Sequence, residues 1–437
     1  MRFISTRHNT PSVSLVEAMY RPIAQDGGLY MPESLPVLPH AVIDNMKEMT
    51  IAEIGYVVLN ALLGDYFSSS ELKQLAESAL NFPVPMATLD NGISILELFE
   101  GPTLSFKDFG ARIMARLLEL AFKPTEGQKL NIVMATTGNT GSAMASALAG
   151  IKNVNVFVVF PRGTAGRALE SQFTTLGGGI IPVEVNGTID DCHAMVASAL
   201  RDTSINSQLK ILSANSINIA RLLGQTIYYF YGVCHLPDFG TRRFEPVTLA
   251  IPAGNLGNLS ACLIARNMGL DIGKVIAAEN ANNYLTRAII EEDFEPRRAI
   301  PTLAYAADKS VPTNFERILD LVDGDAEKLR AQIQPMSFSD SDIIRIINDC
   351  RRETGYLLDP HSALAYAGLK AVLKPGEQGL MLATAHPAKS LDAMTLITGR
   401  PIDLPLQLTT FMTGHDHRVK IAPSTWGLRR LILDANK

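Results

Sequence analysis

Two patterns of hydrophobic and polar residues divide the chain near residue 90. In the segments TIAEIGYVVLNALLG, at 50–64, and SSELKQLAESALN, at 69–81, apolar residues recur every three to four positions. This spacing places them on one face of a helix. Pro and Gly interrupt the preceding stretch AQDGGLYMPESLPVLP, at 24–39, which is typical of surface turns. We therefore predict a mainly helical N-terminal unit over residues 1–90.

From about residue 91 onward, short apolar runs alternate with longer amphipathic segments. The runs are NIVMA at 131–135, NVNVFVVF at 153–160, VTLAIPA at 247–253, KVIAAE at 274–279 and GLMLATA at 379–385. Segments such as GSAMASALAG and ARLLGQTIYYFYGV have the length and pattern of helices. Continuous apolar strands that alternate with helices predict an α/β fold whose parallel sheets are covered on both faces.

The composition excludes some classes of function. Of the 437 residues, 47% are hydrophobic and 19% are charged, which is typical of a globular protein with two or three structural units. The formal net charge is −5, so the chain lacks the basic field that binding to nucleic acids or anionic membranes requires. We therefore expect no nucleic-acid partner and no membrane partner.

The cysteines and histidines predict neither disulfides nor a metal site. The four cysteines are far apart and form no CxxC pair: Cys192, Cys234, Cys262 and Cys350. His415 and His417 have no acidic or cysteine partners at ligand spacing. The segment MRFISTRHNT lacks the apolar core of a signal peptide, and no segment has the roughly 18 to 20 continuous apolar residues of a membrane span. We expect a cytoplasmic protein.

The first candidate for chemistry is Lys107, which lies between Phe106 and Phe109 in GPTLSFKDFG, at 101–110. A lysine in an apolar setting is most often a salt-bridge partner or a side chain whose stem packs on apolar surface. The same setting also tunes amine nucleophiles, because desolvation favours the neutral amine. The surrounding residues alone leave both interpretations open.

Two loops rich in Gly and Asn follow predicted strands. ATTGNTGSAMASALAG, at 135–150, and PAGNLGN, at 252–258, each lie between an apolar run and a helix-like segment. Glycines let the backbone approach a ligand, and a helix N-terminus offers free N–H groups to an anion. Neither loop has the GK[ST] or GxGxxG pattern of nucleotide-binding loops. A phosphate-bearing ligand that is not a nucleotide is therefore favoured. The alternative for each is an ordinary turn between a strand and a helix.

A further strand, in LMLATAHPAK at 380–389, ends at Thr384 and is followed by His386 and Lys389. A histidine at such a place is more often a hydrogen-bonded packing residue than a catalyst. The hydroxyl of Thr384 is the more useful group for binding a ligand.

Together these motifs resemble the threonine synthase family of pyridoxal-phosphate enzymes, which share the tryptophan-synthase-β fold (fold type II). The matching motifs are DGGLYMP at 26–32, LELFEGPTLSFKDFGAR at 96–112, TTGNTG at 136–141, LSANSINIARLLGQ at 212–225, PAGNLGN at 252–258, LDPHSALAY at 358–366 and TAHPAK at 384–389. The resemblance implies two open, mostly parallel sheet lobes beside the helical unit. It places residues 91–128 and 236–437 in a large cofactor-binding domain and residues 129–235 in a smaller domain that moves.

The resemblance also implies the residues that bind the cofactor, pyridoxal 5′-phosphate. Lys107 is implied as the Schiff-base lysine and the catalytic residue. Asn139 is implied to bind the phenolic oxygen of the cofactor, and Thr384 its pyridine nitrogen. The phosphate is implied to lie on the backbone of one loop: Gly254, Asn255, Leu256, Gly257 and Asn258.

In this family the substrate is O-phospho-L-homoserine, and water is the second reactant. The implied reaction is γ-elimination of phosphate followed by β-addition of water, which gives L-threonine. The residues implied to bind the substrate phosphate are Ser213, Asn215, Ser216, Asn218 and Arg221. The loop with Thr137, Gly138 and Thr140 is implied to receive the substrate carboxylate. The family includes monomers and homodimers, and the sequence favours neither.

Some positions differ from the family pattern. Asn139, Asn258 and Asn283 stand where the family commonly has an acidic residue, and Thr164, Ala165 and Gly166 replace a KIS triplet. These differences leave three functions open. The chain is a threonine synthase, or a related pyridoxal-phosphate lyase or β- or γ-replacement enzyme with another amino-acid substrate, or a catalytically silent homologue. Retention of Lys107, both loops and Thr384 argues against a silent homologue.

Overall fold

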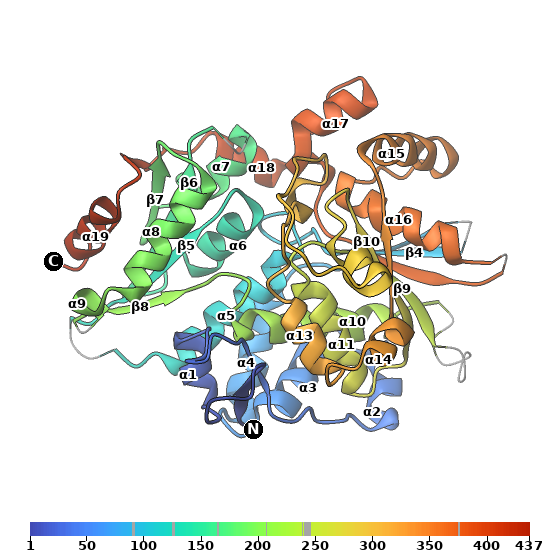
Figure 1. The fold of residues 1–437 in the computed structure, drawn as a ribbon, viewed down its shortest axis with the longest axis horizontal. Coiled ribbons are helices and arrows are strands. Elements are labelled where there is room, and N and C mark those ends of the chain that lie inside the picture. The colour runs from blue at the N-terminus through green and yellow to red at the C-terminus, as the bar shows by residue number, and fades with distance from the viewer. Residues whose placement is uncertain are drawn as a thin grey trace.

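Two open sheets form the frame of the molecule (Figure 1). The computed structural model describes residues 1–89, 92–124, 127–163, 166–206, 208–237, 239, 246–374 and 376–437. The larger sheet has the strand order β11 (Ile333–Ser337), β10 (Ile272–Glu279), β9 (Val247–Pro252), β12 (Gly379–Ala383), β4 (Ile93–Glu97), β3 (Met86–Thr88). All neighbouring strands in it are parallel except β3 and β4, which are antiparallel.

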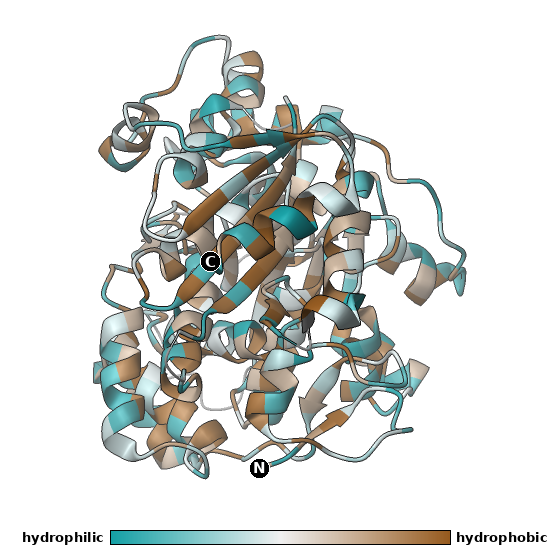
Figure 2. Cartoon of the chain, turned by 90° about the vertical axis from the view of Figure 1, so that its left-hand side faces the viewer, coloured by the Kyte–Doolittle hydropathy of each residue, from teal (hydrophilic) through white to brown (hydrophobic). Residues whose placement is uncertain are grey.

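The smaller sheet is parallel throughout. Its five strands have the order β13 (Val419–Ile421), β7 (Ile180–Val185), β6 (Val154–Pro161), β5 (Leu130–Ala135), β8 (Lys210–Ser213). We call the six-stranded sheet with its helices the large lobe and the five-stranded sheet with its helices the small lobe. Strands of the small lobe, which faces the viewer in Figure 2, are largely apolar, whereas many hydrophilic residues lie on the surrounding helices and loops.

The strands of the large lobe are apolar on both faces, as the continuous runs predict. Along β9, Leu249 and Ile251 belong to a core shared with helices α3 (Ile51–Leu63), α5 (Lys107–Ala121), α10 (Ile219–Cys234) and α11 (Gly257–Asn267). Ala250, between them, belongs to a second core with α15 (Asp340–Thr354) and α16 (Pro360–Val372). Alternate side chains of a strand point to opposite faces, so helices cover both sides of this sheet.

The same rule holds in the small lobe. Ile132 of β5 packs in the core that contains α6 (Asn139–Leu148), whereas Val133 packs with α8 (Ile189–Arg201) and α19 (Thr425–Asp434). Helix α7 (Arg167–Thr174) lies against α6 and β7. The connections from strand to helix in both lobes place the loops that follow β5, β9 and β12 at the carboxyl ends of their strands, where open α/β sheets bind ligands.

The N-terminal unit is mainly helical. Besides α3 it contains α1 (Leu15–Tyr20), α2 (His40–Asn45) and α4 (Ser69–Ala79), together with a short antiparallel pair, β1 (Phe3–Ser5) and β2 (Tyr30–Pro32). Helix α3 begins with a capping box, in which the side chain of Thr50 accepts a hydrogen bond from the backbone of Glu53 and the Glu53 carboxylate accepts one from the backbone of Thr50. The unit packs below the large lobe through contacts of α3 with α10 and of α4 with α5.

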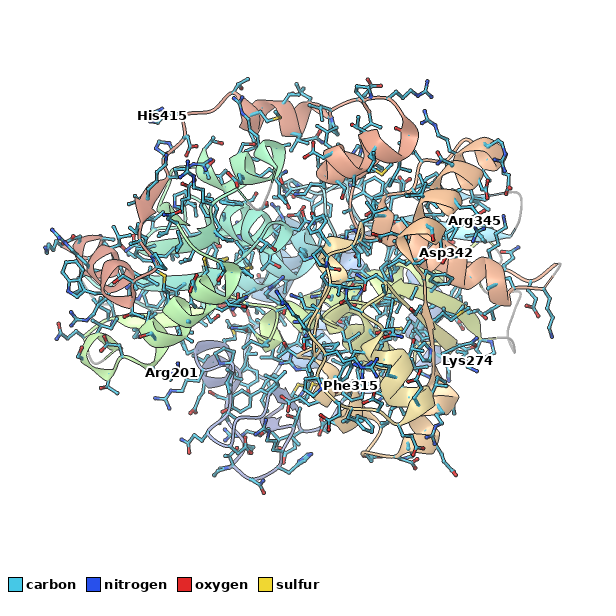
Figure 3. The ribbon with its side chains drawn as sticks, turned by 45° about the horizontal axis from the view of Figure 1, so that its top comes forward. Arg201, Lys274, Phe315, Asp342, Arg345 and His415 are labelled. Carbon is cyan, nitrogen blue, oxygen red and sulfur yellow. The ribbon has the colours of Figure 1, made fainter. Side chains whose placement is uncertain are left out.

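The remaining elements connect or cover these parts. They are the helices α9 (Thr203–Asn206), α12 (Tyr284–Thr286), α13 (Phe315–Leu321), α14 (Ala326–Gln332), α17 (Leu391–Thr398) and α18 (Leu406–Met412), and the short helical turns η1 (Met46–Glu48), η2 (Arg287–Glu291), η3 (Tyr305–Ala307) and η4 (Pro387–Ser390). At the outer end of α15, Asp342 and Arg345 form a surface ion pair of 3.0 Å (Figure 3).

A close crossing of α5 and α10 brings two predicted site residues together. A Cβ on Gly110 of α5 would lie 2.5 Å from the carbonyl oxygen of Arg221, and a Cβ on Gly224 of α10 would lie 2.8 Å from Cβ of Ile113. Only glycine fits at these two positions without displacing the helices. The crossing therefore holds Lys107, at the start of α5, beside Arg221.

The predicted α/β fold with two mostly parallel lobes is confirmed by the sheet topology. Three parts of the chain lie elsewhere than the predicted ranges place them. Helix α10 lies within 129–235 but packs with α3, α5 and α11 in the core of the large lobe. Strand β3 lies within residues 1–90 but pairs with β4 of the large sheet. Strand β13 and helix α19 lie within 236–437, yet β13 pairs with β7 and α19 packs on α8 of the small lobe.

Candidate active site

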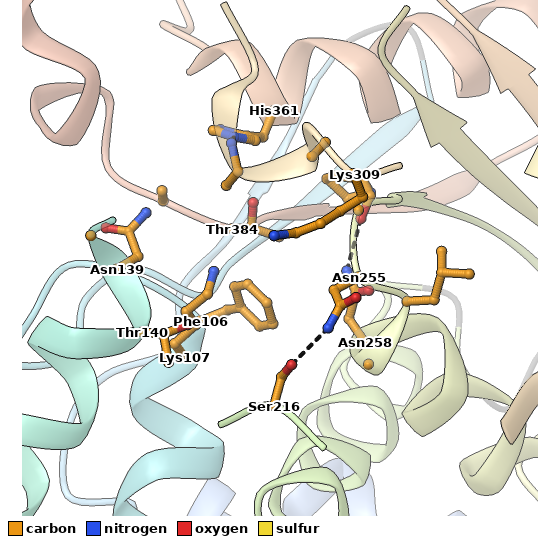
Figure 4. A pocket seen from close by; sticks show the side chains of 18 of the residues that line it. Phe106, Lys107, Asn139, Thr140, Ser216, Asn255, Asn258, Lys309, His361 and Thr384 are labelled. Carbon is orange, nitrogen blue, oxygen red and sulfur yellow. Dashed lines mark hydrogen bonds between the residues drawn. The ribbon is translucent and has the colours of Figure 1, made fainter. Parts of the chain in front are cut away.

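A pocket lies between the two lobes and contains most of the predicted site residues (Figure 4). The small lobe contributes the loop 136–140, and the large lobe contributes Lys107, the loop 254–258 and Thr384. The lining residues include two lysines and one arginine, Lys107, Lys309 and Arg221, and among the described residues that line the pocket there is no Asp or Glu. The pocket is therefore suited to anions.

Lys107 is the first residue of α5, and the loop before it is held against the end of β12. The amide of Phe106 donates a hydrogen bond of 2.9 Å to the carbonyl of Thr384, and Ser105 forms an antiparallel bridge with Ala385. Leu104 has a positive φ of 59°, a conformation that a leucine rarely adopts. Such strain persists only where the surrounding structure fixes it, and it is often found at functional sites.

The amine of Lys107 is prepared for chemistry by its surroundings. Burial lowers the pKa of Lys107 to about 7, and the positive charges of Arg221 and Lys309 add to this effect. The position of Lys107 in the first helical turn acts in the same direction, because the positive end of the helix dipole disfavours an ammonium ion. A substantial fraction of this lysine is therefore a neutral amine at neutral pH.

The loop of the small lobe presents Asn139 at the start of α6. The hydroxyl of Thr136 accepts hydrogen bonds from the amides of Gly138, at 3.0 Å, and Gly141, at 3.1 Å, which fixes the turn. The side-chain amide of Asn139 donates a long hydrogen bond of 3.4 Å to the hydroxyl of Tyr305, whereas its buried carbonyl oxygen Oδ1 has no partner among the described residues. Native proteins rarely leave such a group unpaired, so this oxygen is available to a ligand.

The loop 254–258 of the large lobe is held rigidly. The side chain of Asn255 donates to the hydroxyl of Ser216 at 2.8 Å and accepts from the amide of Thr313 at 2.7 Å. The side chain of Asn258 donates to the carbonyl of Pro252 at 2.9 Å. Leu256, with φ of 60°, is in the left-handed conformation and precedes the first turn of α11. The loop thus directs the free amides of a helix N-terminus into the pocket, which is an arrangement that binds phosphate.

Thr384 and Arg221 complete the predicted lining. Thr384 is 5% exposed and lies at the end of β12. Arg221 is 1% exposed, and its guanidinium donates to the carbonyl of Ala214 at 3.2 Å, while its Nε has no partner among the described residues. Burial lowers the pKa of Arg221 to about 10, which leaves it charged at neutral pH.

Three residues predicted to bind substrate, Ser213, Asn215 and Asn218, are not among the residues that line the pocket. The reason is clearest for Asn218, whose side chain caps α10 by accepting from the amide of Ala220 and donates to the carbonyls of Met19 and Ser213. Ser216 of the same segment does line the pocket, as do Thr137, Gly138 and Thr140 of the other predicted substrate loop.

Sequence reasoning assigned no role to several other side chains of the pocket, among them Tyr305, Lys309 and His361. His361 lies in the matching motif LDPHSALAY, which could have drawn attention to it. Tyr305 and Lys309 come from a short turn and its flank, with no glycine-rich pattern or strand end beside them. They are found only through the fold.

The positions that differ from the family pattern lie in various surroundings. Thr164 and Ala165 fall outside the described residues, and Gly166 directly precedes α7. Asn258 anchors its loop, and Asn283 precedes α12. His415 lies at the edge of the small lobe, away from the pocket (Figure 3), and the centroid of its ring is 4.8 Å from that of His417. No described helix has the length and apolar character needed to cross a membrane.

The chain matches two family models. One, described as pyridoxal-phosphate dependent enzyme, covers residues 88–384, and the other, described as threonine synthase N terminus, covers residues 2–80. Among curated proteins, it is 36% identical to the threonine synthase of Serratia marcescens over 409 residues, which are 93% of each chain. It is also 36% identical to the threonine synthase of Escherichia coli (strain K12), over 93% of this chain and 94% of the other.

Solved structures agree with these matches. The crystal structure of threonine synthase from Escherichia coli superposes with a TM-score of 0.90 at 34% identity, covering 99% of this chain and all of the other. The crystal structure of threonine synthase from Brucella melitensis, which contains bound pyridoxal phosphate, superposes with a TM-score of 0.93 at 28% identity and covers 100% of both chains.

Proposed function

The chain belongs to the threonine synthase family of pyridoxal-phosphate-dependent enzymes, and from this premise we propose which of its residues perform the reaction. The pocket between the lobes converts O-phospho-L-homoserine and water to L-threonine and phosphate. Lys107 holds the cofactor and moves protons, and the loops 136–140 and 254–258 bind the anionic groups.

One observation carries this assignment: the Lys107 amine lies in the same pocket as the unpaired Oδ1 of Asn139, the hydroxyl of Thr384 and the N-terminus of α11. These four groups come from segments far apart in the sequence. They are the groups that pyridoxal phosphate needs: an amine for its aldehyde, a partner for its phenolic oxygen, a hydroxyl for its ring nitrogen and free amides for its phosphate.

The cofactor and this chain divide the work. When bound, pyridoxal phosphate withdraws electrons from the substrate and makes the protons on its α- and β-carbons acidic. Thr384 offers a neutral hydroxyl to the ring nitrogen, which does not force that nitrogen to be protonated. Asn139 and the loop 254–258 fix the orientation of the ring.

Lys107 is suited to accept and return protons because its pKa is about 7. A base whose pKa is near the working pH combines a large neutral fraction with a useful driving force for proton transfer. Arg221 and Ser216 bind the substrate phosphate, while Thr137, Gly138 and Thr140 receive the substrate carboxylate. A carboxylate at the start of α6 also gains from the helix dipole.

The small lobe closes over the substrate in this proposal. The two lobes already meet across the pocket through the 3.4 Å hydrogen bond between Asn139 and Tyr305, which is long enough to tighten on closure. We assign residues 419–434 to the moving part as well, because β13 and α19 pack on the small sheet.

The test uses the purified enzyme with added cofactor. O-phospho-L-homoserine is supplied, and threonine and phosphate are measured together; equal amounts of both are expected. Borohydride reduction followed by peptide mass spectrometry should locate the cofactor on Lys107, and Lys107→Ala should lose both the label and the activity. Lys47→Ala, at an exposed lysine far from the pocket, is the control. A label on another lysine, or phosphate release without threonine, would refute the assignment.

A further inference from the structure

We propose that Lys309 is a specificity-determining residue that binds the phosphate group of the substrate together with Arg221. This inference rests on the proposed function, because it names a second cation for the same reaction. Lys309 lines the pocket, and its side chain extends into it on the side of Thr384 (Figure 4).

The segment that carries Lys309 is anchored on both sides. The turn η3 places Ala306 so that its amide donates a hydrogen bond of 3.1 Å to Nε2 of His361. Asp308, directly before Lys309, accepts hydrogen bonds from the side chains of Asn280, at 2.8 Å, and Asn282, at 3.1 Å, and from the hydroxyl and amide of Thr302. The backbone at Lys309 is therefore fixed relative to the pocket.

His361 is itself held in one orientation. Its Nδ1 lies 2.7 Å from Oδ2 of Asp359, which is buried at the N-terminus of α16. Because Nε2 accepts from the amide of Ala306, Nδ1 must carry the proton that His361 donates to Asp359. This arrangement uses both ring nitrogens, so His361 positions the turn and has no free nitrogen for proton transfer.

Burial lowers the pKa of Lys309, and the negative charge of the preceding residue, Asp308, partly offsets this effect, although the two side chains form no ion pair. The carboxylate of Asp308 is occupied by the four hydrogen bonds from Asn280, Asn282 and Thr302, and no ion pair of Lys309 is found within the described part of the chain. Burial lowers the pKa of His193 on α8, and the positive charge of Lys309 adds to this effect. The charge of Lys309 also contributes to the lowered pKa of Lys107. Lys309 thus acts on groups of both lobes, at the place where they face each other.

The charges of the reactants require such a group. The cofactor brings one phosphate, and O-phospho-L-homoserine brings a second phosphate and a carboxylate. The loop 254–258 accounts for the first phosphate and the loop 137–140 for the carboxylate. Arg221 alone would leave the substrate phosphate dianion only half neutralised, and Lys309 supplies the second positive charge.

The experiment compares Lys309→Gln, Lys309→Arg and the control Lys47→Gln in the holoenzyme. Lys309 is an exposed residue, so its variants should fold. With O-phospho-L-homoserine we expect Lys309→Gln to lose roughly ten- to a hundredfold in kcat/KM, mainly through KM, and Lys309→Arg to retain most of it. Inorganic phosphate should inhibit the wild type competitively and should inhibit Lys309→Gln correspondingly less.

Three outcomes would overturn the inference. Unchanged KM and unchanged phosphate inhibition in Lys309→Gln would show that Lys309 does not meet the phosphate. An equal loss with O-acetyl-L-homoserine, whose leaving group carries no dianion, would show that Lys309 does not distinguish the leaving group. A weakened affinity for pyridoxal phosphate, matching the change in KM, would place Lys309 on the cofactor instead. If the wild type releases no phosphate at all, the proposed function itself fails, which is a different result from any of these.

Discussion

The side-chain nitrogen of Lys389, whose pKa burial lowers to about 7, donates a hydrogen bond of 2.7 Å to the carbonyl oxygen of Thr103. It also donates to Oε1 of Gln172, which lies on α7 of the small lobe. Thr103 in turn donates from its amide, at 2.9 Å, and its hydroxyl, at 2.7 Å, to the carboxylate of Asp108. The buried network therefore joins the two lobes directly behind Lys107.

Removing the cation of this network should destabilise the protein. Lys389 and Asp108 are both buried, at 6% and 1% exposure, and the positive charges of Lys389 and Arg112 both favour the Asp108 carboxylate. We expect Lys389→Met to lower the free energy of unfolding by about 1–3 kcal/mol, because the carbonyl of Thr103 and Oε1 of Gln172 lose their buried donor; urea denaturation of the cofactor-free protein measures this. The double variant Lys389→Met/Asp108→Asn should recover part of this loss. A double variant that is less stable than Lys389→Met would contradict the coupling.

The reactivity of Lys107 should depend on pH around neutrality. Its pKa is about 7 in the folded protein, against an ordinary value of 10.5, because burial and then Arg221 disfavour the ammonium form. Since the unfolded chain holds this proton more tightly, the burial of Lys107 costs stability below about pH 7, and this cost fades as the pH rises toward 10.5. The neutral amine that attacks an aldehyde is formed over the lower part of the same range.

We therefore expect the rate at which the cofactor-free protein reacts with pyridoxal to rise as the pH passes through about 7. Pyridoxal lacks the phosphate, so phosphate contacts do not enter this measurement. Arg221→Met should move the midpoint to higher pH, because it removes the larger of the two neighbouring charges while burial remains. A midpoint near 10.5 in the wild type, or no change in Arg221→Met, would show that these surroundings do not tune the amine.

Much of the site could be predicted because its parts have local signatures. Lys107, the loop around Asn139 and the loop 254–258 each follow an apolar strand and carry glycines or a lysine among aromatic residues. The carboxyl ends of β9 and β12 meet at one edge of the large sheet, so a correct prediction of these strands brings the loop 254–258 and Thr384 together. The loop around Asn139 follows β5 of the other sheet, so its place beside them depends on how the two lobes pack.

The missed residues have no such signature. Tyr305 meets Asn139, which is 166 positions away, from an irregular turn whose place is set by His361 and Asp308. Asn218 was predicted at the site, but its amide caps a helix and binds the carbonyl of Met19, in the N-terminal unit. Strand β13 joins the small sheet through pairing with β7, more than 200 positions earlier. Pairings of this kind depend on the packed fold and leave no periodic mark in the sequence.

Asn139 should matter for cofactor binding more than for folding. Its Oδ1 is buried without a partner among the described residues, and its amide makes only the 3.4 Å bond to Tyr305. We expect Asn139→Ala to change the free energy of unfolding of the cofactor-free protein by less than about 1 kcal/mol. The substitution removes a weak hydrogen bond, which costs stability, and a buried oxygen without a partner, whose removal offsets that cost. The dissociation constant of pyridoxal phosphate, measured by absorbance titration, should rise about tenfold.

Tyr305→Phe is the matched control for Asn139→Ala, since it removes the other end of the same hydrogen bond and keeps the Asn139 amide. It should weaken the binding of pyridoxal phosphate less than Asn139→Ala does. If Asn139→Ala destabilises the cofactor-free protein as much as the holoenzyme, then Asn139 serves the fold and the ligand contact is refuted.

The two glycines of the loop 254–258 should respond differently to the same added methyl group. A Cβ on Gly254 would lie 3.0 Å from Cα of Ala307 and 3.1 Å from the carbonyl oxygen of Ala306, so it would press on the turn that carries Tyr305 and Lys309. A Cβ on Gly257 would meet nothing nearer than the side-chain amide of Asn314, at 3.6 Å.

Gly254→Ala should therefore lower the free energy of unfolding by about 1–3 kcal/mol, the usual cost of overpacking. Gly257→Ala, at the first position of α11, should change it by less than about 1 kcal/mol. Urea denaturation of both variants without cofactor measures the difference, and equal destabilisation would show that the contact with residues 306 and 307 does not constrain the loop.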